Sequence, residues 1–236
     1  MLSPVAVFVV ALVVFLGGGG TGGTGGSGVA EPETAPGSTA SPAQPSDAPT
    51  PPAAADPLEQ LDALAAPSGQ PGDYHRDAFG PGWLDPDRNG CDARNDTLAR
   101  DLVDVTFRPG TNDCVVVSGT LHDPYTGTTI AFLKGQDTSE LVQIDHVVPL
   151  ALAWRSGAFG WDTVEREAFA NDPLNLLAVD GEANQSKSDS GPALWMPPNS
   201  AFACEYSADF IAVLAKYRLS ITAEDRSSLI STLGGC

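Results

Sequence analysis

The pattern of apolar and polar positions between residues 114 and 179 predicts several β-strands. Two β-rich runs, 114–119 and 128–133, flank a turn-forming segment at 123–127, and this arrangement is typical of a β-hairpin. Residues 142–147 and 176–179 are predicted to form two further short strands, with His146 near the end of the first. The pattern therefore predicts a hairpin followed by two more strands.

Apolar residues at three- and four-residue spacing predict helices around these strands. The spacing of Leu98, Leu102 and Val105 predicts a helix over residues 97–105, and Asp180 is placed to cap another helix directly after the last strand. Further helices are expected at 151–154, 163–170, 210–217 and 222–233. Because strands and helices are mixed without a regular alternation, the predicted fold class is α+β.

Residues 1–30 have the character of a signal peptide or an N-terminal hydrophobic segment. Residues 4–15 are an uncharged apolar run, which suits a signal-peptide core but is shorter than the roughly 20 residues that span a bilayer. No Lys or Arg precedes the run, so a retained anchor with the domain facing outside is the alternative. Export is expected in either case.

The rest of the chain divides into a linker and a domain. Residues 31–72 are rich in Pro, Ala and Gly and contain no aromatic or basic residue, which predicts a disordered linker. Within it, residues 58–64 have a short apolar pattern that a frayed helix would explain. Residues 73–236 hold all four Trp, all four Cys and all 12 basic residues. This length is normal for one domain with a sizeable core.

The charge of the domain argues against strong electrostatic attraction to a polyanion. From residue 73 onward there are 24 acidic and 12 basic residues, a net charge of −12. Counterion release can therefore supply little affinity for nucleic acid. An enzyme that acts on nucleic acid would have to depend on a bridging metal ion and on a local cluster of basic side chains.

The four cysteines predict two disulfides. Cys91, Cys114, Cys204 and Cys236 form no C-x-x-C pair, so a zinc knuckle is not expected. Disulfides fit an exported domain. The sequence allows three pairings, and we favour Cys91–Cys114 with Cys204–Cys236 because each closes a short local loop.

The candidate chemistry lies in Asp145-His146 and the residues that follow. Asn175, Asn184 and Lys187 come downstream, on the last predicted strand and the helix after it. A histidine can deprotonate water, while carboxylate and amide oxygens can hold a hard divalent cation. A lysine can meet phosphate charge. This set of side chains predicts metal-assisted cleavage of a phosphodiester bond.

The same residues resemble the HNH endonucleases, and most closely the secreted actinobacterial DUF1524 branch, which is similar to the C-terminal domain of GmrSD. The motif is Asn175-Leu176-Leu177-Ala178-Val179, followed by Asn184 and Lys187. Further similar blocks lie at 74–80, 89–94, 123–127 and 195–199. The resemblance implies a ββα-metal (His-Me finger) core with an additional hairpin, flanking helices and two disulfides.

The resemblance also implies a role for each residue of the motif. His146 would be the general base, Asp145 and Asn184 would bind one divalent cation, Asn175 would orient His146, and Lys187 would lie near the scissile phosphate. The cation would be Mg²⁺, with Mn²⁺ as a substitute, because the ligands are oxygens. Many family members have histidine where this chain has Asn184, so zinc should bind less well here. Activity should fall below the pKa of His146, which is near 6.5 if unperturbed.

A second pattern resembles the start of a calcium loop. Asp85, Asp87 and Asn89 alternate before Gly90, and Asp96 stands at the position of the usual glutamate. Alternating oxygen ligands can enclose Ca²⁺. We favour a plain Asp/Asn turn, because the bidentate glutamate is missing.

The substrate contacts and the partner are the least specified part of the prediction. Arg94 and Arg155 are candidate phosphate contacts, and each could equally be a structural ion pair. The predicted partner is nucleic acid, with DNA favoured, and the oligomeric state has no signature. The competing class is an exported, non-catalytic module that binds calcium or a cell-surface polymer.

Overall fold

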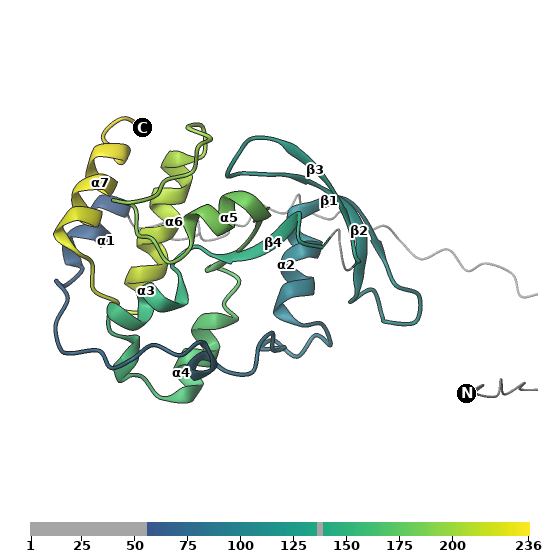
Figure 1. Ribbon diagram of the computed structural model, residues 1–236, viewed down its shortest axis with the longest axis horizontal. Coiled ribbons are helices and arrows are strands. Elements are labelled where there is room, and N and C mark those ends of the chain that lie inside the picture. Colours follow the sequence, from purple (N-terminus) through teal and green to yellow (C-terminus); the bar gives the residue numbers. More distant parts are fainter. Residues whose placement is uncertain (1–55, 136–138) are drawn as a thin grey trace, which may run out of the picture. The chain divides into compact units, whose positions relative to one another are not determined.

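The computed structural model describes residues 56–135 and 139–236 of the chain (Figure 1). The predicted signal peptide and residues 31–55 of the predicted linker lie outside this part. Within it, no helix has the length and apolar character needed to cross a membrane. The helices are α1 (Pro57–Ala63), α2 (Ala93–Asp101), α3 (Leu150–Arg155), α4 (Thr163–Ala170), α5 (Gly181–Lys187), α6 (Ala203–Lys216) and α7 (Ala223–Leu233), with 3-10 helices η1 (Arg76–Phe79) and η2 (Ala158–Gly160).

The folded region begins earlier than the predicted boundary at residue 73. Helix α1 lies within the segment predicted to be linker, and its Leu61 is completely buried against α6 and α7. Asp56 caps the start of α1 by accepting a hydrogen bond from the backbone N–H of Leu58 at 2.8 Å. Arg226 of α7 donates to the backbone carbonyls of Leu61 and Leu64 at the other end. One buried leucine and two satisfied helix ends are enough to fix a segment whose composition resembles a linker.

The predicted hairpin is confirmed. Strands β2 (Val116–His122) and β3 (Thr129–Leu133) pair antiparallel, with His122 opposite Thr129. Asp123 closes the turn by accepting from the backbone N–H of Thr126 at 2.7 Å. Strand β1 (Leu102–Phe107) pairs with the other edge of β2, so the sheet has the order β1-β2-β3.

The helix predicted over residues 97–105 is wrong in its bounds. Helix α2 covers Ala93–Asp101 instead, and the chain continues directly into β1. The side chain of Asp92 caps it, accepting from the N–H of Asn95 at 2.8 Å. Residues 103–107 alternate apolar and polar side chains with β-branched valines, which favours a strand. The three-residue spacing from Leu102 to Val105 fits a helix and would put the two side chains on opposite faces of a regular strand. Strand β1 accommodates this spacing because its pairing with β2 shifts register between Val103 and Thr106.

A second, two-stranded sheet leads into α5. Strands β4 (Val142–His146) and β5 (Leu176–Asp180) pair antiparallel, with His146 opposite Leu176. As predicted, Asp180 caps the next helix, accepting from the N–H of Ala183 at 2.8 Å. A side chain at Gly181 would lie 2.0 Å from the carbonyl oxygen of Glu140, so only glycine lets α5 start this close to β4. The order strand, strand, helix is the one expected.

Strand β4 lies between two hydrophobic cores. The larger core contains aromatic residues of the helical part, including Phe169, Tyr206 and Phe210. The smaller one contains Leu98 of α2 and Ile144 of β4 together with residues of the three-stranded sheet. Figure 1 shows β4 running between the helices and that sheet. The end of β4 is thus held from both sides, which suits a position that must be rigid.

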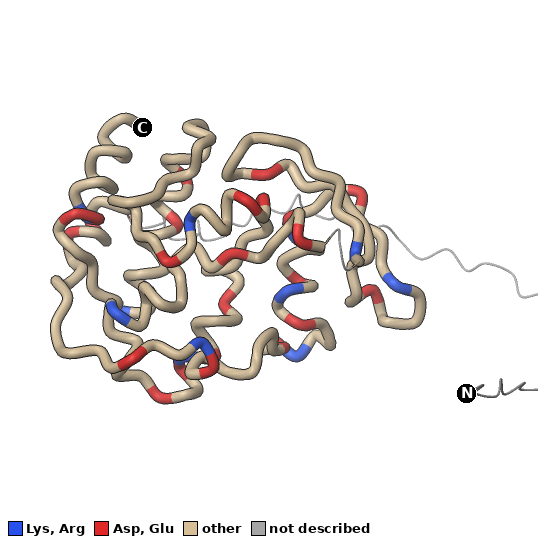
Figure 2. The backbone as a smooth tube through the Cα atoms, viewed as in Figure 1, with Lys and Arg blue, Asp and Glu red and all other residues tan. Residues whose placement is uncertain are grey.

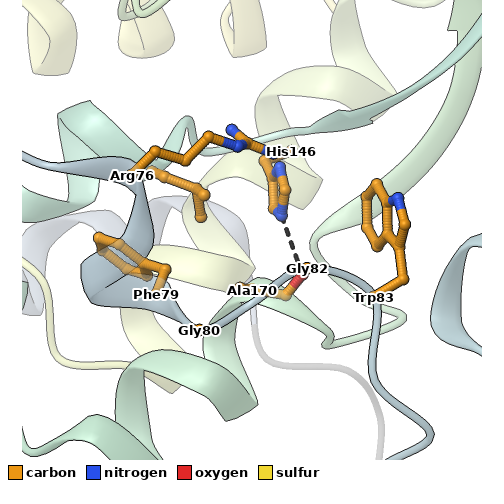
Figure 3. Close-up of a pocket in the computed structure, with 8 residues that line it drawn as sticks. Arg76, Phe79, Gly80, Gly82, Trp83, His146 and Ala170 are labelled. Atoms are coloured by element: carbon orange, nitrogen blue, oxygen red, sulfur yellow. Dashed lines mark hydrogen bonds between the residues drawn. The ribbon is translucent and has the colours of Figure 1, made fainter.

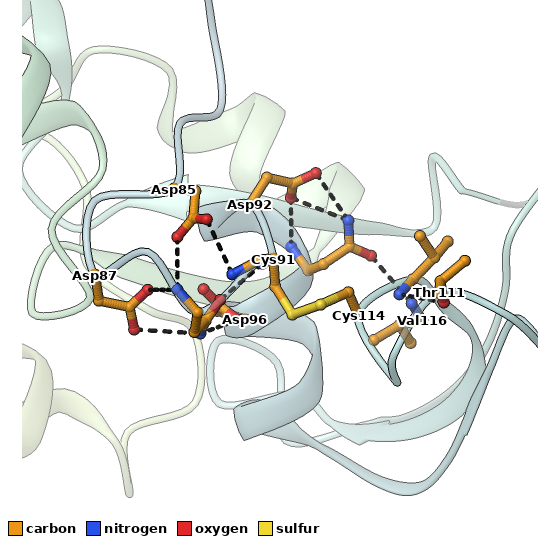
Figure 4. The surroundings of a disulfide bond; sticks show 12 residues. Asp85, Asp87, Cys91, Asp92, Asp96, Thr111, Cys114 and Val116 are labelled. Atoms are coloured by element: carbon orange, nitrogen blue, oxygen red, sulfur yellow. Dashed lines mark hydrogen bonds between the residues drawn. A yellow bond between two sulfur atoms is a disulfide. The ribbon is translucent and has the colours of Figure 1, made fainter.

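Both predicted disulfides are confirmed. Cys91–Cys114 joins the loop before α2 to the segment before β2 (Figure 4). Cys204–Cys236 joins the start of α6 to the C-terminus after α7. Within residues 56–135 and 139–236 no cysteine is free.

Candidate active site

Three of the predicted site residues meet in one cavity. Asp145 and His146, at the end of β4, line a cavity of about 480 Å³ together with Asn184 of α5. Gln143 and Arg76 line it as well. Residues nearly forty positions apart are brought together because α5 packs across both β4 and β5.

His146 is held in one orientation and one tautomer. Its Nε2 lies 2.9 Å from the backbone oxygen of Ala170. A carbonyl oxygen can only accept, so Nε2 carries the proton and Nδ1 of the neutral ring is left as a proton acceptor. Figure 3 shows the ring between Arg76 and Trp83, with its second nitrogen on the side of the Arg76 guanidinium. The indole of Trp83 is parallel to the imidazole within 8°, with 5.8 Å between the ring centroids.

Burial keeps this histidine neutral. His146 is only 7% exposed, and desolvation lowers its pKa from 6.5 to about 4. The positive charges of Arg76 and Lys187 act in the same direction, and the hydrogen bond with Ala170 and the charge of Asp145 oppose them. At neutral pH the ring is therefore a free base.

Asn175 fixes the chain just beyond His146. Its side chain is fully buried and accepts from the backbone N–H of Val148 at 2.8 Å while donating to the oxygen of the same residue at 3.3 Å. Its backbone oxygen accepts from the N–H of Val147 at 2.9 Å. These bonds join the start of β5 to the segment after β4, a geometry consistent with the predicted role in orienting His146.

Lys187 is not where the sequence led us to expect it. The prediction put it near the scissile phosphate, but its side chain is fully buried and does not line the cavity. Its Nζ donates to Oδ2 of Asp145 at 2.7 Å and to the backbone oxygen of His146 at 2.8 Å. Lys187 is the last residue of α5, and its side chain lies against the end of β4. Lys187 therefore stabilises the positions of Asp145 and His146 without lining the cavity itself.

Tyr125 is a site residue that sequence reasoning missed. Its hydroxyl donates to the same Oδ2 of Asp145 at 2.5 Å, and the residue is fully buried. Burial, reinforced by the charge of Asp145, raises the pKa of Tyr125 well above its usual range, so the hydroxyl remains a donor. The segment 123–127 was recognised as a turn and as a block similar to the family. Nothing in a turn pattern indicates that its tyrosine points inward.

The side-chain oxygens of Asp145 and Asn184 are ligands of the kind that a hard divalent cation prefers. Oδ2 of Asp145 is occupied by Tyr125 and Lys187, while Oδ1 makes no hydrogen bond with any described residue. The Asn184 amide donates to Oε1 of Gln143 at 2.8 Å, which leaves its oxygen available. Over the described ranges no group of three or more His, Cys, Asp or Glu could hold a metal ion. A cation here would therefore complete its shell with water and phosphate oxygens, as Mg²⁺ commonly does.

The two arginines proposed as phosphate contacts lie elsewhere. Arg94 is on α2, partly buried, and burial lowers its pKa. Arg155 forms an ion pair with Asp189 at 2.7 Å and lines a different cavity. The arginine that the fold brings to His146 is Arg76, at the start of η1. Few basic positions are found anywhere on the described chain, whereas acidic ones are spread over most of its elements (Figure 2).

The candidate calcium loop forms the hydrogen bonds of an Asp/Asn turn. Asp85 accepts from the backbone N–H groups of Asn89 and Gly90, at 3.1 and 3.0 Å. The Asn89 amide donates to Asp87 at 3.2 Å and to Asp96 at 3.1 Å (Figure 4). The carboxylates thus point at donors of their own loop, in agreement with the turn that we favoured.

Comparison with known proteins places this site within a family. The chain matches the family described as GmrSD restriction endonucleases, C-terminal domain, over residues 92–232. It is also 39% identical over 194 residues to a protein of Arthroderma benhamiae described as an uncharacterized secreted protein, covering 80% of this chain and 90% of the relative. No solved structure matches the chain. The family match includes all five predicted residues of the Asp145–Lys187 set, and this chain belongs to the family of GmrSD restriction endonuclease C-terminal domains.

Proposed function

We propose that this protein is a secreted, metal-dependent endonuclease of the HNH type, which hydrolyses phosphodiester bonds in nucleic acid, with DNA as the favoured substrate. The observation that carries the proposal is the meeting of Asp145, His146 and Asn184 in one cavity, with His146 held neutral. Membership of a restriction endonuclease family supports the reaction class. The disulfides and the secreted relative support export. The placement in the actinobacterial DUF1524 branch remains a prediction.

In the proposed reaction His146 activates water. Nδ1 takes a proton from a water molecule as its oxygen attacks phosphorus, and the hydrogen bond from Nε2 to Ala170 keeps the ring aimed during the transfer. Oδ1 of Asp145 and the amide oxygen of Asn184 would hold the cation. When bound, it supplies Lewis-acid stabilisation of the phosphate and of the leaving 3′ oxygen.

The test is cleavage by the full-length, oxidised protein. We expect a 5′-labelled DNA duplex, single-stranded DNA and RNA to show which nucleic acid is cut in Mg²⁺ or Mn²⁺, and EDTA to abolish cleavage. Measuring all three substrates in parallel identifies the preferred one. Absence of cleavage of every substrate with either cation would refute the proposal and favour the non-catalytic binding module.

The pH dependence should reflect the buried state of His146. Because burial lowers the pKa of His146 to about 4, the ring stays neutral when the pH falls through 6.5, and a neighbouring cation would lower the pKa further. We expect the acid limb of the rate profile to lie below pH 5 and not near the unperturbed value of 6.5. Initial rates in overlapping buffers from about pH 3 to 8 measure this limb. A midpoint between 6 and 7 would show that His146 is not the base, or that it is not buried in the working enzyme.

A further inference from the structure

Because the domain is acidic, an incoming phosphate would need a positively charged side chain in the cavity. Arg76 is such a side chain. Among the described basic residues, Arg76 alone lines the cavity that holds Asp145, His146 and Asn184. We propose that Arg76 is a catalytic residue whose guanidinium binds the phosphate under attack. This inference rests on the proposed function.

The position of Arg76 suits a contact with substrate. Besides the 480 Å³ cavity, it lines a second, smaller cavity together with His146 and Trp83. Figure 3 shows the guanidinium beside the imidazole, on the side away from the bond to Ala170. Arg76 is also solvent-exposed, so an incoming phosphate can reach it without displacing packed side chains.

The charge of Arg76 is not neutralised by any carboxylate in the described structure. Its guanidinium forms no ion pair with a described carboxylate, and it interacts with the neutral hydroxyl of Tyr74. Basic residues that do form ion pairs include Lys187 with Asp145 and Arg155 with Asp189. The domain has twice as many acidic as basic residues, yet the arginine at the candidate catalytic cavity has no described carboxylate partner. An anionic ligand would neutralise its charge.

The support under Arg76 is rigid. Phe79, three residues later, is 2% exposed and packs against Trp154 and Phe169. Arg166 of α4 donates to the backbone oxygen of Ala78 at 2.8 Å. The 3-10 helix that carries Arg76 is therefore anchored to the larger core, and the guanidinium is presented from a fixed base.

The chemistry matches what the transition state requires. Water oxygen bonds to phosphorus as its proton passes to His146, the bond from phosphorus to the 3′ oxygen breaks, and the leaving oxygen takes a proton from solvent. Negative charge grows on the non-bridging oxygens during this displacement. A planar guanidinium donates two parallel hydrogen bonds to such oxygens, which an ammonium group cannot do.

Cleavage kinetics give the first test. We expect Arg76→Ala to lower kcat on labelled DNA by about 10²–10³-fold, the usual cost of removing one such donor, and Arg76→Lys to recover part of the loss. Arg108→Ala is the matched control, because Arg108 is equally exposed but follows β1 and lines neither cavity. An Arg76→Ala enzyme within about threefold of wild type would overturn the inference while leaving the proposed function intact.

Binding without catalysis gives an independent test. In EDTA, the affinity for a labelled single-stranded oligonucleotide is measured at several NaCl concentrations. Loss of one phosphate contact should reduce the slope of log K against log[salt] by about 0.7 in Arg76→Ala and leave Arg108→Ala unchanged. An unchanged slope in Arg76→Ala would refute the contact even in an active enzyme. A reduced slope in a protein that cuts nothing would support the contact and refute the nuclease proposal.

Discussion

Replacing His146 with alanine is expected to lower the rate of metal-dependent phosphodiester cleavage by about 10²–10⁴-fold. This is the usual contribution of a positioned general base, and no other histidine lines the cavity. The measurement is the single-turnover rate on labelled DNA at saturating Mg²⁺. Because the ring is also packed against Trp83 and bonded to Ala170, thermal unfolding must be measured on the same protein.

Two further variants separate chemistry from folding. His146→Gln places an amide N–H where Nε2 stands, so it can still donate to Ala170 but cannot take a proton, and it should fold and remain inactive. His122→Ala removes an exposed imidazole on β2 that lines neither cavity at His146, and it should cleave at the wild-type rate. Wild-type activity in His146→Gln would remove this histidine from the mechanism.

Replacing Lys187 with alanine is expected to destabilise the folded protein by about 3–5 kcal/mol. The ammonium group is fully buried and pairs with Asp145, so its removal leaves an uncompensated carboxylate inside the protein. The cavity left by the side chain adds to the cost. Urea unfolding of the oxidised protein measures the change in the free energy of unfolding.

A double variant shows whether the charge is the cause. Lys187→Met combined with Asp145→Asn removes both charges while nearly preserving volume, and replacement of a whole buried pair is often neutral. We expect this double variant to be more stable than Lys187→Met alone, yet inactive, because the carboxylate that would bind the cation is gone. If Lys187→Met alone were as stable as wild type and fully active, the ion pair would neither stabilise the fold nor position the Asp145 carboxylate.

The parts of the fold that the sequence predicted well are those decided by neighbouring residues. The hairpin at 123–127 and the cap at Asp180 depend on short-range backbone hydrogen bonds, and both were found where expected. The bounds of α2 could not be predicted in this way, because the spacing of Leu102 and Val105 indicates a helix while the alternation over residues 103–107 favours a strand. Pairing with β2, which is distant in the sequence, decided the outcome.

The sequence grouped three residues that share a cavity in the fold, but it did not indicate the geometry around them. Asp145, His146 and Asn184 could be grouped because a strand, strand and helix in that order place them close together. The burial of Lys187 could not be foreseen, since it depends on how closely α5 approaches β4 at Gly181. Tyr125 was missed for a different reason: an inward-facing residue of a turn has no periodic pattern that the sequence could reveal.

The two disulfides have a consequence for the cell that makes the protein. They close loops with sequence separations of 23 and 32 residues, and cross-links of this size contribute about 3 kcal/mol each by restricting the unfolded chain. In a cytosol that keeps thiols reduced, the newly made chain lacks this contribution. Passage into an oxidising compartment is then the step that completes its stability, and before that step the cell contains only the less stable, thiol form.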